Sequence, residues 1–542
     1  MSKYADKKVL IVEDFTDFAR AVGIMLRNIG IPYSDTVTSG EAAIQACREK
    51  KYDIILSDYN LGPQKDGQQV LEELITFNLI KPSCVFIMIT AEKAAAMVMG
   101  AIEYQPDSYL TKPFNNQTLK LRLDRAIEKK LTLNPIIRKL DKNSWQEAYK
   151  LCDEVIESSP KYRSSCLQLK LDALRGGKQL DKAFKLVTQL ADERVTPWIL
   201  KCLGNIHYQR GELKKAENTF IEMTENFPMV IEGYDLLANV QHKLEKPVDA
   251  QKTLQKAVER SPKPLKRQKH LGQLAEQNND YDTMTHAYRQ AVRYGENSAF
   301  SGAEEYVKLA KSIGHILKGN TNEDRKKLIA EAKSLFNQIE QKFKQDPCAQ
   351  FRGVVAHADF SAIIKDQKST DKYKEIAPSL FEKVEEHIGA NESIEIAQSL
   401  KNVGLSQLAE CVIEEAVEQY FDDPAFIKQA SKITSNKHLI KNAKKADKLN
   451  NKAVKFFKSG DFVSAIELFI EASEIAPNNV NIALNHAQAL LKRFQKKQEN
   501  PQDLYNSEDI LAEITRLPLT DPRYSRYSEL LRLNQLMLQK VE

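Results

Sequence analysis

Long apolar runs are the first feature that this sequence lacks. No stretch of about 18 apolar residues occurs in its 542 residues, which argues against a membrane-spanning helix. The N-terminus leads straight into a short apolar run, without the long apolar stretch and small-residue cleavage site of a secretory signal. The seven cysteines are scattered, with no C-x-x-C pair and no histidine at metal-ligand spacing, so we expect reduced, buried thiols. Together these absences predict a cytoplasmic protein.

The sequence also lacks a large excess of charge of one sign, and it lacks familiar catalytic motifs. The net charge of +5 is small for this length and argues against a dedicated binder of nucleic acid or of a membrane surface. We find no Gly-rich phosphate loop, no Ser or Cys nucleophile motif, no zinc pattern and no signature of a cyclic-dinucleotide synthase. A chain of this length exceeds a single core, so several domains or a solenoid are expected.

Residues 1–130 alternate between strand-like and helix-like patterns. The strand-like runs are KKVLIVED, YDIILSD, CVFIMIT and SYLTKPF, with a weaker YSDTVTS between the first two. Amphipathic segments separate them, and the first carries an apolar stripe formed by Phe18, Val22, Met25, Leu26 and Ile29. Five strand-and-helix units predict an α/β domain with a doubly wound five-stranded parallel sheet.

Chemically active side chains stand at the ends of these predicted strands. Glu13 and Asp14 end the first strand, Asp58 the third, Thr90 the fourth and Lys112 the fifth. Ligands bind beyond the carboxyl ends of parallel strands, so these groups should meet at one edge. Each alone has a commoner structural role, such as a helix cap for aspartate, but five such residues at the ends of four of the predicted strands favour one shared site. Crowded carboxylates need a cation, and an all-oxygen set suits Mg²⁺.

A hard divalent ion and a lysine around a central carboxylate predict a site that receives a phosphoryl group, with Asp58 as the nucleophile. On these residues, positions 7–130 resemble the receiver domain of bacterial response regulators, which has a flavodoxin-like fold. The resemblance implies that Asp14, Asp58 and the backbone carbonyl of Asn60 hold Mg²⁺, with Glu13 acting through water. It also implies a phosphohistidine on a sensor histidine kinase as the donor.

The same resemblance assigns roles to the remaining residues of the site. Thr90 matches the switch hydroxyl, Tyr109 the aromatic ring that changes rotamer on activation, and Lys112 the lysine before a cis-proline. Asn60 and Glu92 match the pair found in chemotaxis-type receivers, which lose their phosphate quickly, and therefore imply a transient signal. We expect no enzymatic activity apart from self-phosphorylation and self-dephosphorylation.

Beyond residue 130 the sequence is rich in Leu, Ala, Lys, Glu and Gln, and Pro135 is expected to end the last helix of the α/β domain. A 34-residue period relates several units, whose shared positions are Gly204, Ala216, Phe220 and Pro228; Ala238, Ala250, Leu254 and Pro262; Ala397, Ala409 and Ile413; and Ala453, Ala465, Phe469 and Pro477. The pattern resembles the tetratricopeptide (TPR) repeat, an all-α helical solenoid. We expect TPR-like repeats over 131–300 and 390–542, with divergent helical repeats over 301–389.

Such solenoids bind peptides or helices in a concave groove. Lys201, Asn205 and Lys266 fall where the repeat family places a carboxylate-binding clamp, but Leu236 and His270 replace its other polar residues. Ordinary solvated lysines are the competing interpretation.

The leading hypothesis is a two-component response regulator whose phosphorylation gates protein binding by the repeats, or their oligomerisation, with a homodimer as one outcome. In the first alternative, the partner is the kinase or a sister regulator, and the chain modulates a phosphorelay. In the second, the chain is a DNA-binding transcription regulator; the absence of a winged-helix or helix-turn-helix unit with a basic recognition helix argues against it.

Overall fold

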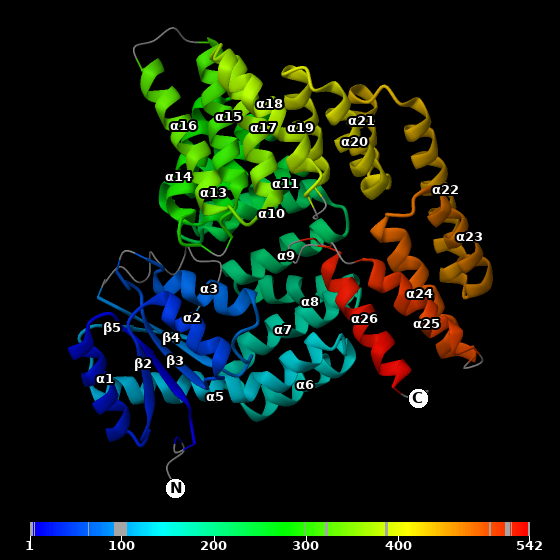
Figure 1. The fold of residues 1–542 in the computed structure, drawn as a ribbon. Helices are drawn as coiled ribbons and strands as arrows, with labels where there is room; N and C mark the ends of the chain where they lie inside the picture. Colours follow the sequence, from blue (N-terminus) through cyan, green and yellow to red (C-terminus); the bar gives the residue numbers. More distant parts are fainter. Residues whose placement is uncertain are drawn as a thin grey trace. The chain divides into compact units, whose positions relative to one another are not determined.

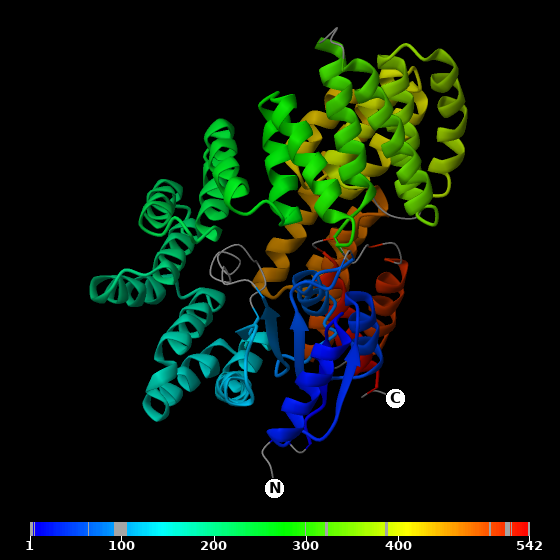
Figure 2. The same ribbon diagram turned by 90° about the vertical axis from the view of Figure 1, so that its left-hand side faces the viewer.

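The computed structural model describes most of the chain (Figures 1 and 2). The described residues are 4, 6–62, 64–91, 106–298, 300–319, 324–384, 388–497, 500–514, 517, 521 and 523–539. They form two compact units, Met1–Ser301 and Gly302–Glu542, and each is considered by itself. Within these residues, no helix combines the length and the apolar character that a bilayer crossing requires.

A sheet of five parallel strands forms the N-terminal part of the first unit. The strands are β1 (Val9–Val12), β2 (Ser34–Val37), β3 (Ile54–Asp58), β4 (Val85–Thr90) and β5 (Ser108–Thr111). Their order is β2-β1-β3-β4-β5, and every neighbouring pair is parallel. β1, β3 and β4 are buried along their whole length, whereas β2 at the edge is partly exposed. The predicted doubly wound sheet is confirmed.

Helices cover both faces of this sheet. Their bounds are α1 (Thr16–Asn28), α2 (Gly40–Glu49), α3 (Gly67–Thr76) and α5 (Asn116–Asp141). α1 and the first part of α5 share one apolar core with the sheet, while α2 and α3 share the core on the opposite face. The predicted stripe of α1 faces the sheet, with Val22 and Leu26 fully buried.

Helix α5 continues from the α/β domain into the helical region without a break (Figure 1). The expectation that Pro135 ends this helix is wrong, because Pro135 lies inside it. A proline in a helix interior costs about 3 kcal/mol through a lost hydrogen bond and a clash with the preceding turn. Packing at both ends offsets that cost, since Leu119 is buried against the sheet while Leu133 and Ile136 are buried among the helices that follow.

The rest of the first unit consists of helices that pack in pairs along the chain (Figure 2). Their bounds are α6 (Trp145–Ser158), α7 (Arg163–Gly176), α8 (Leu180–Glu193), α9 (Pro197–Gln209), α10 (Leu213–Asn226), α11 (Glu232–Lys243), α12 (Pro247–Arg260), α13 (Leu265–Gln277) and α14 (Tyr281–Gly295). α9 pairs with α10, α11 with α12 and α13 with α14. This is the helix-turn-helix architecture that the 34-residue period predicts.

Small residues allow the two helices of a pair to approach closely. A Cβ atom at Gly204 of α9 would lie only 2.4 Å from the Phe220 ring of α10. Two periods later, a Cβ atom at Gly272 of α13 would lie 2.6 Å from the Tyr288 ring of α14. This third consecutive unit escaped the sequence comparison because Met284 stands where the earlier units carry alanine.

The second unit is all-helical in its described residues. The helices are α15 (Ala303–Gly319), α16 (Arg325–Lys342), α17 (Pro347–Ile363), α18 (Gln367–Phe381), α19 (Ala390–Asn402), α20 (Ser406–Tyr420), α21 (Pro424–Ile433), α22 (Lys437–Ser459), α23 (Phe462–Ile475), α24 (Val480–Lys497), α25 (Gln502–Glu513) and α26 (Tyr524–Leu538). α15 and α17 have 17 residues and α16 has 18, whereas α9 has 13 and α10 has 14. Longer helices lengthen the repeat, which explains the poor match to a 34-residue period in this region.

The close approach at Gly204 generates a stability prediction. Gly204→Ala would force a methyl group into the Phe220 ring, and overpacking of this kind costs about 1–3 kcal/mol. We expect a lower midpoint of denaturant-induced unfolding. The matched control is Gly319→Ala at the exposed end of α15, where an added Cβ meets nothing within 4 Å and no loss is expected. Equal midpoints for the two variants would contradict the packing argument.

Candidate functional site

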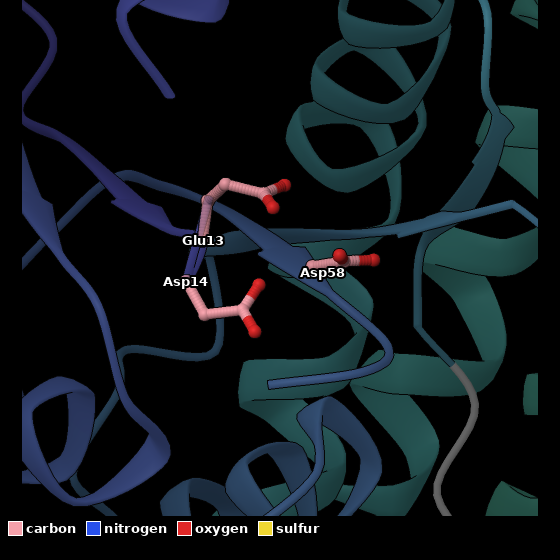
Figure 3. A group of neighbouring side chains, drawn as sticks. All are labelled: Glu13, Asp14 and Asp58. Carbon is pink, nitrogen blue, oxygen red and sulfur yellow. The ribbon is translucent and has the colours of Figure 1, made fainter. Parts of the chain in front are cut away.

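Three carboxylates meet at the carboxyl end of β1 and β3. Glu13 and Asp14 directly follow β1, and Asp58 is the last residue of β3. Figure 3 shows their side chains side by side, and one carboxylate oxygen from each lies within 4.8 Å of the others. Glu13 is 2% exposed and Asp58 8% exposed, whereas Asp14 faces solvent. The strand order reverses direction between β1 and β3, so the cluster lies at the topological switch point of the sheet.

Lys112 neutralises part of this negative charge. Its Nζ atom lies 2.8 Å from Glu13 Oε2 and 2.8 Å from Asp58 Oδ2, and donates a hydrogen bond to each. The same atom lies 4.1 Å from the centroid of the Phe18 ring on α1. Burial by itself would lower the pKa of Lys112, but its hydrogen bonds to Asp58 and Glu13 outweigh that effect and raise the pKa. Lys112 is therefore a fixed cation at the centre of the site.

One lysine does not balance three carboxylates. Burial raises the pKa of Glu13 above its usual range, the hydrogen bond from Lys112 opposes that rise, and the neighbouring charge of Asp58 adds to it. A divalent cation among these oxygens would relieve both the burial cost and the repulsion. The donor set consists of hard oxygen atoms, one of them solvent-facing, which fits an ion that retains bound water.

The other residues predicted for the site lie around this cluster. Thr90 is buried at the end of β4, and its carbonyl accepts a hydrogen bond from the Lys112 backbone N–H at 2.8 Å. The peptide bond between Lys112 and Pro113 is cis, as the family resemblance implies. Asn60 is exposed two residues after Asp58, and Glu92 lies outside the described residues.

Tyr109 on β5 has its hydroxyl group enclosed by protein. Among the described residues this hydroxyl has no hydrogen-bond partner. Burial, with a smaller contribution from Tyr59, raises the pKa of Tyr109 to about 12. Both tyrosine rings pack against the same apolar core beneath the sheet.

Two of the three groove residues predicted on the repeats contact other side chains within the first unit. Lys201 Nζ lies 2.5 Å from the Glu232 carboxylate on the next helix pair. Lys266 Nζ lies 5.2 Å from the centroid of the Phe300 ring. Asn205 is half-buried on α9. A carboxylate ligand would therefore compete with Glu232 for Lys201.

Two further residues shape the site and escaped the sequence reasoning. Phe18 was assigned only to the apolar face of α1, yet its ring borders Lys112. Gly67 begins α3 so close to strand β3 that a Cβ atom would lie 2.2 Å from the Asp58 carbonyl oxygen. A glycine immediately after a helix-capping aspartate, here Asp66, was a signal available in the sequence.

Known proteins are similar in sequence to the N-terminal part of this chain. The family model for the response regulator receiver domain matches residues 9–124. Chemotaxis protein CheY-3 of Vibrio cholerae is 30% identical over 122 residues, which cover 22% of this chain and 92% of that protein. One solved structure is the receiver domain of a sensor histidine kinase from Pseudomonas aeruginosa, which has a magnesium ion in its active-site cleft. It is 27% identical to this chain, with a TM-score of 0.20, and the match covers 22% of this chain and 98% of that one. Part of a TPR repeat-containing protein from Cytophaga hutchinsonii is 12% identical, with a TM-score of 0.35, covering 46% of this chain and 95% of that one.

The charge balance around Lys112 predicts a pH-dependent change in stability. Lys112→Met removes the ammonium group that lowers the pKa of Glu13, so that pKa should rise further. A carboxyl group with a raised folded-state pKa binds its proton more tightly when folded, so the folded state loses stability as pH increases above the unfolded pKa of 4.5. We therefore expect the melting temperature of the variant to decrease, relative to that of the wild type, as the pH increases from 4.5 towards neutrality.

The control for this measurement is Lys120→Met, which removes an exposed lysine from the first turns of α5. Its melting temperature should follow the wild-type pH profile. Parallel profiles for all three proteins would show that Lys112 does not offset the carboxylate charge.

Proposed function

Because the chain belongs to the response regulator receiver family through residues 9–124, we propose that it accepts a phosphoryl group on Asp58 from a phosphohistidine of a sensor histidine kinase. We further propose that phosphorylation controls which proteins the repeat helices bind. The observation that carries the proposal is the cluster of Glu13, Asp14 and Asp58 with Lys112 bonded to two of them.

The transfer follows from the chemistry of these groups. An Asp58 carboxylate oxygen attacks the phosphorus atom, a P–O bond forms, the P–N bond to the donor imidazole breaks, and the imidazole takes a proton as it leaves. Lys112 supplies a positive charge beside the acceptor and can pair with the phosphoryl oxygens. Asp58 is 8% exposed, so only a small part of its side chain is open to a donor.

Asp14, Asp58 and the backbone carbonyl of Asn60 would hold Mg²⁺, with Glu13 acting through a bound water. When bound, the ion would supply positive charge that offsets the charge of the transferring phosphoryl group. Asp14 is exposed and can keep contact with the hydration shell that Mg²⁺ retains. The raised pKa of Glu13 supports the assignment, since a neighbouring cation stabilises the ionised form of a buried carboxyl.

Thr90 and Tyr109 are the residues proposed to report the phosphorylated state. Thr90 ends β4 beside the acceptor strand, where its hydroxyl can bond a phosphoryl oxygen. Tyr109 shares an apolar core with Tyr59, which directly follows Asp58. Asn60 and Glu92 are proposed to tune the lifetime of the phosphorylated state.

The repeat region is proposed as the output surface. Its helix pairs resemble solenoid repeats in which peptides or helices bind to an exposed concave groove. Lys201, Asn205 and Lys266 are the candidates for contacts with an acidic partner, with Glu232 as an internal competitor at Lys201. We place the protein in the cytoplasm, because its seven cysteines, six of them buried, form no disulfide.

Phosphoryl labelling tests the acceptor directly. The purified full chain, given Mg²⁺ and acetyl phosphate, should gain one acid-stable, base-labile phosphoryl group that Asp58→Asn abolishes. The matched control is Asp53→Asn, which alters the aspartate just before the opposite end of β3 and should label normally. Phosphate-affinity electrophoresis measures the label, and its persistence in the Asp58 variant would refute the assignment.

Metal binding provides a separate test. Asp14→Asn removes a charged oxygen ligand, and we expect Mg²⁺ affinity to fall at least about tenfold, equivalent to about 1.4 kcal/mol. The control is Asp17→Asn, an exposed residue on the first turn of α1. Titration of Mg²⁺ by NMR or calorimetry measures both. Equal affinities would exclude Asp14 as a ligand.

A further inference from the structure

The receiver domain contacts the repeats of the first unit at a place close to Asp58. Two side chains from the receiver reach backbone carbonyls at the end of α14. Lys65 Nζ donates to the carbonyl of Asn297 at 2.7 Å, and Gln69 Nε2 donates to the carbonyl of Tyr294 at 3.4 Å. The contact therefore begins in the segment between β3 and α3 and extends into the first turn of α3.

One lysine from the repeats completes this contact. Lys263 lies between α12 and α13, and its Nζ atom donates to the Tyr59 hydroxyl at 3.2 Å. The same atom lies 5.1 Å from the centroid of the Tyr59 ring and 3.8 Å from Asp66 Oδ2. We call the set of Tyr59, Lys65, Asp66 and Gln69 with Lys263, Tyr294 and Asn297 the receiver–repeat contact.

The receiver side of this contact is tied to the phosphoacceptor through tightly packed backbone. Tyr59 follows Asp58, its N–H donates to the Ile89 carbonyl at 2.8 Å, and its carbonyl accepts from the Gly67 N–H at 2.8 Å. Gly67 leaves no room for a Cβ atom against the Asp58 carbonyl. Because packed interiors transmit displacements, a shift of the Asp58 segment moves Tyr59 and the start of α3 together.

The capping of α3 extends this coupling. Asp66 accepts from the Gln69 N–H at 2.9 Å, and the Gln69 side chain accepts from the Asp66 N–H at 3.0 Å. This reciprocal cap holds the two residues as one rigid group. Lys263 and the Tyr294 carbonyl therefore bind a group that cannot move independently of the first turn of α3.

The repeat side of the contact adjoins the proposed output groove. Lys263 lies three residues before the groove candidate Lys266, which is in the first turn of α13. Lys263 remains 58% exposed, and exposed ion pairs and hydrogen bonds are individually weak. A contact made of a few polar interactions, with an exposed lysine on the repeat side, is suited to opening and closing, in contrast to the continuous apolar packing of α5.

We infer that the receiver–repeat contact is an autoinhibitory latch, in which the segment after Asp58 holds the α12–α13 corner closed until Asp58 is phosphorylated. The inference rests on the proposed function. Tyr59 and Asp66 lie at contact distance from Lys263 on backbone that is packed against Asp58, so a shift of the Asp58 segment would lengthen these contacts and open them. Linkage then requires that breaking the contact favour the phosphorylated form by the same factor.

Hydrogen exchange on the full chain tests the latch, with beryllofluoride and Mg²⁺ as the phosphoryl mimic. In the wild type, the mimic should speed amide exchange at least about threefold over residues 288–298 and 263–270. Lys263→Ala should show fast exchange without the mimic, and should bind beryllofluoride more tightly by a similar factor. Lys263→Arg keeps the charge beside Tyr59 and should restore slow exchange.

Lys252→Ala is the matched control, because Lys252 is an exposed lysine on α12 of the same helix pair and should behave as wild type. Unchanged exchange in Lys263→Ala, or slower exchange in the wild type with the mimic, would overturn the latch. Phosphoryl labelling of Asp58 distinguishes a failure of the latch from a failure of the proposed function. Normal labelling without any exchange difference removes the latch alone, whereas a failure to label removes the proposed function and the latch with it.

Discussion

The repulsion among Glu13, Asp14 and Asp58 is the constraint on which the α/β domain depends. Parallel strands bring their carboxyl ends to one edge, so acidic residues at the ends of β1 and β3 cannot avoid one another. Lys112 partly neutralises two of the three carboxylates, those of Glu13 and Asp58, through direct hydrogen bonds. The charge left over supports the proposal that a cation, and then a phosphoryl group, binds at this edge. In that proposal, the carboxylates that need a counter-charge for stability are the ones that take part in the chemistry.

The α/β domain is joined to the rest of the first unit by two kinds of connection. Helix α5 is rigid, because apolar packing at both of its ends outweighs the cost of an internal proline. The contact of Tyr59 with Lys263 is polar and half open to solvent. In the proposed latch, the rigid helix beside the weak contact would let a local change at Asp58 alter one surface without separating the domain from the repeats.

The repeats depend on a different constraint, the distance between paired helices. Gly204 and Gly272 each lie where an added methyl group would enter an aromatic ring of the partner helix. These close approaches bury Phe220 and Tyr288 almost completely. Where helices lengthen in the second unit, as in α15 to α17, the pairing persists while the period changes. The two units therefore share the pairing of adjacent helices, whereas the number of residues per repeat differs.

The strands, their order of appearance and the residues at their ends were all readable in the sequence, because burial patterns and strand-end positions are local properties. The helix pairs were readable wherever small residues kept a regular period. Only the tertiary structure decided that α5 runs through Pro135, that Glu232 engages Lys201, and that Lys263 meets Tyr59 from 204 residues away. Each of these depends on groups distant in sequence, whose contact energies outweigh or redirect local preferences and leave no periodic trace in the chain.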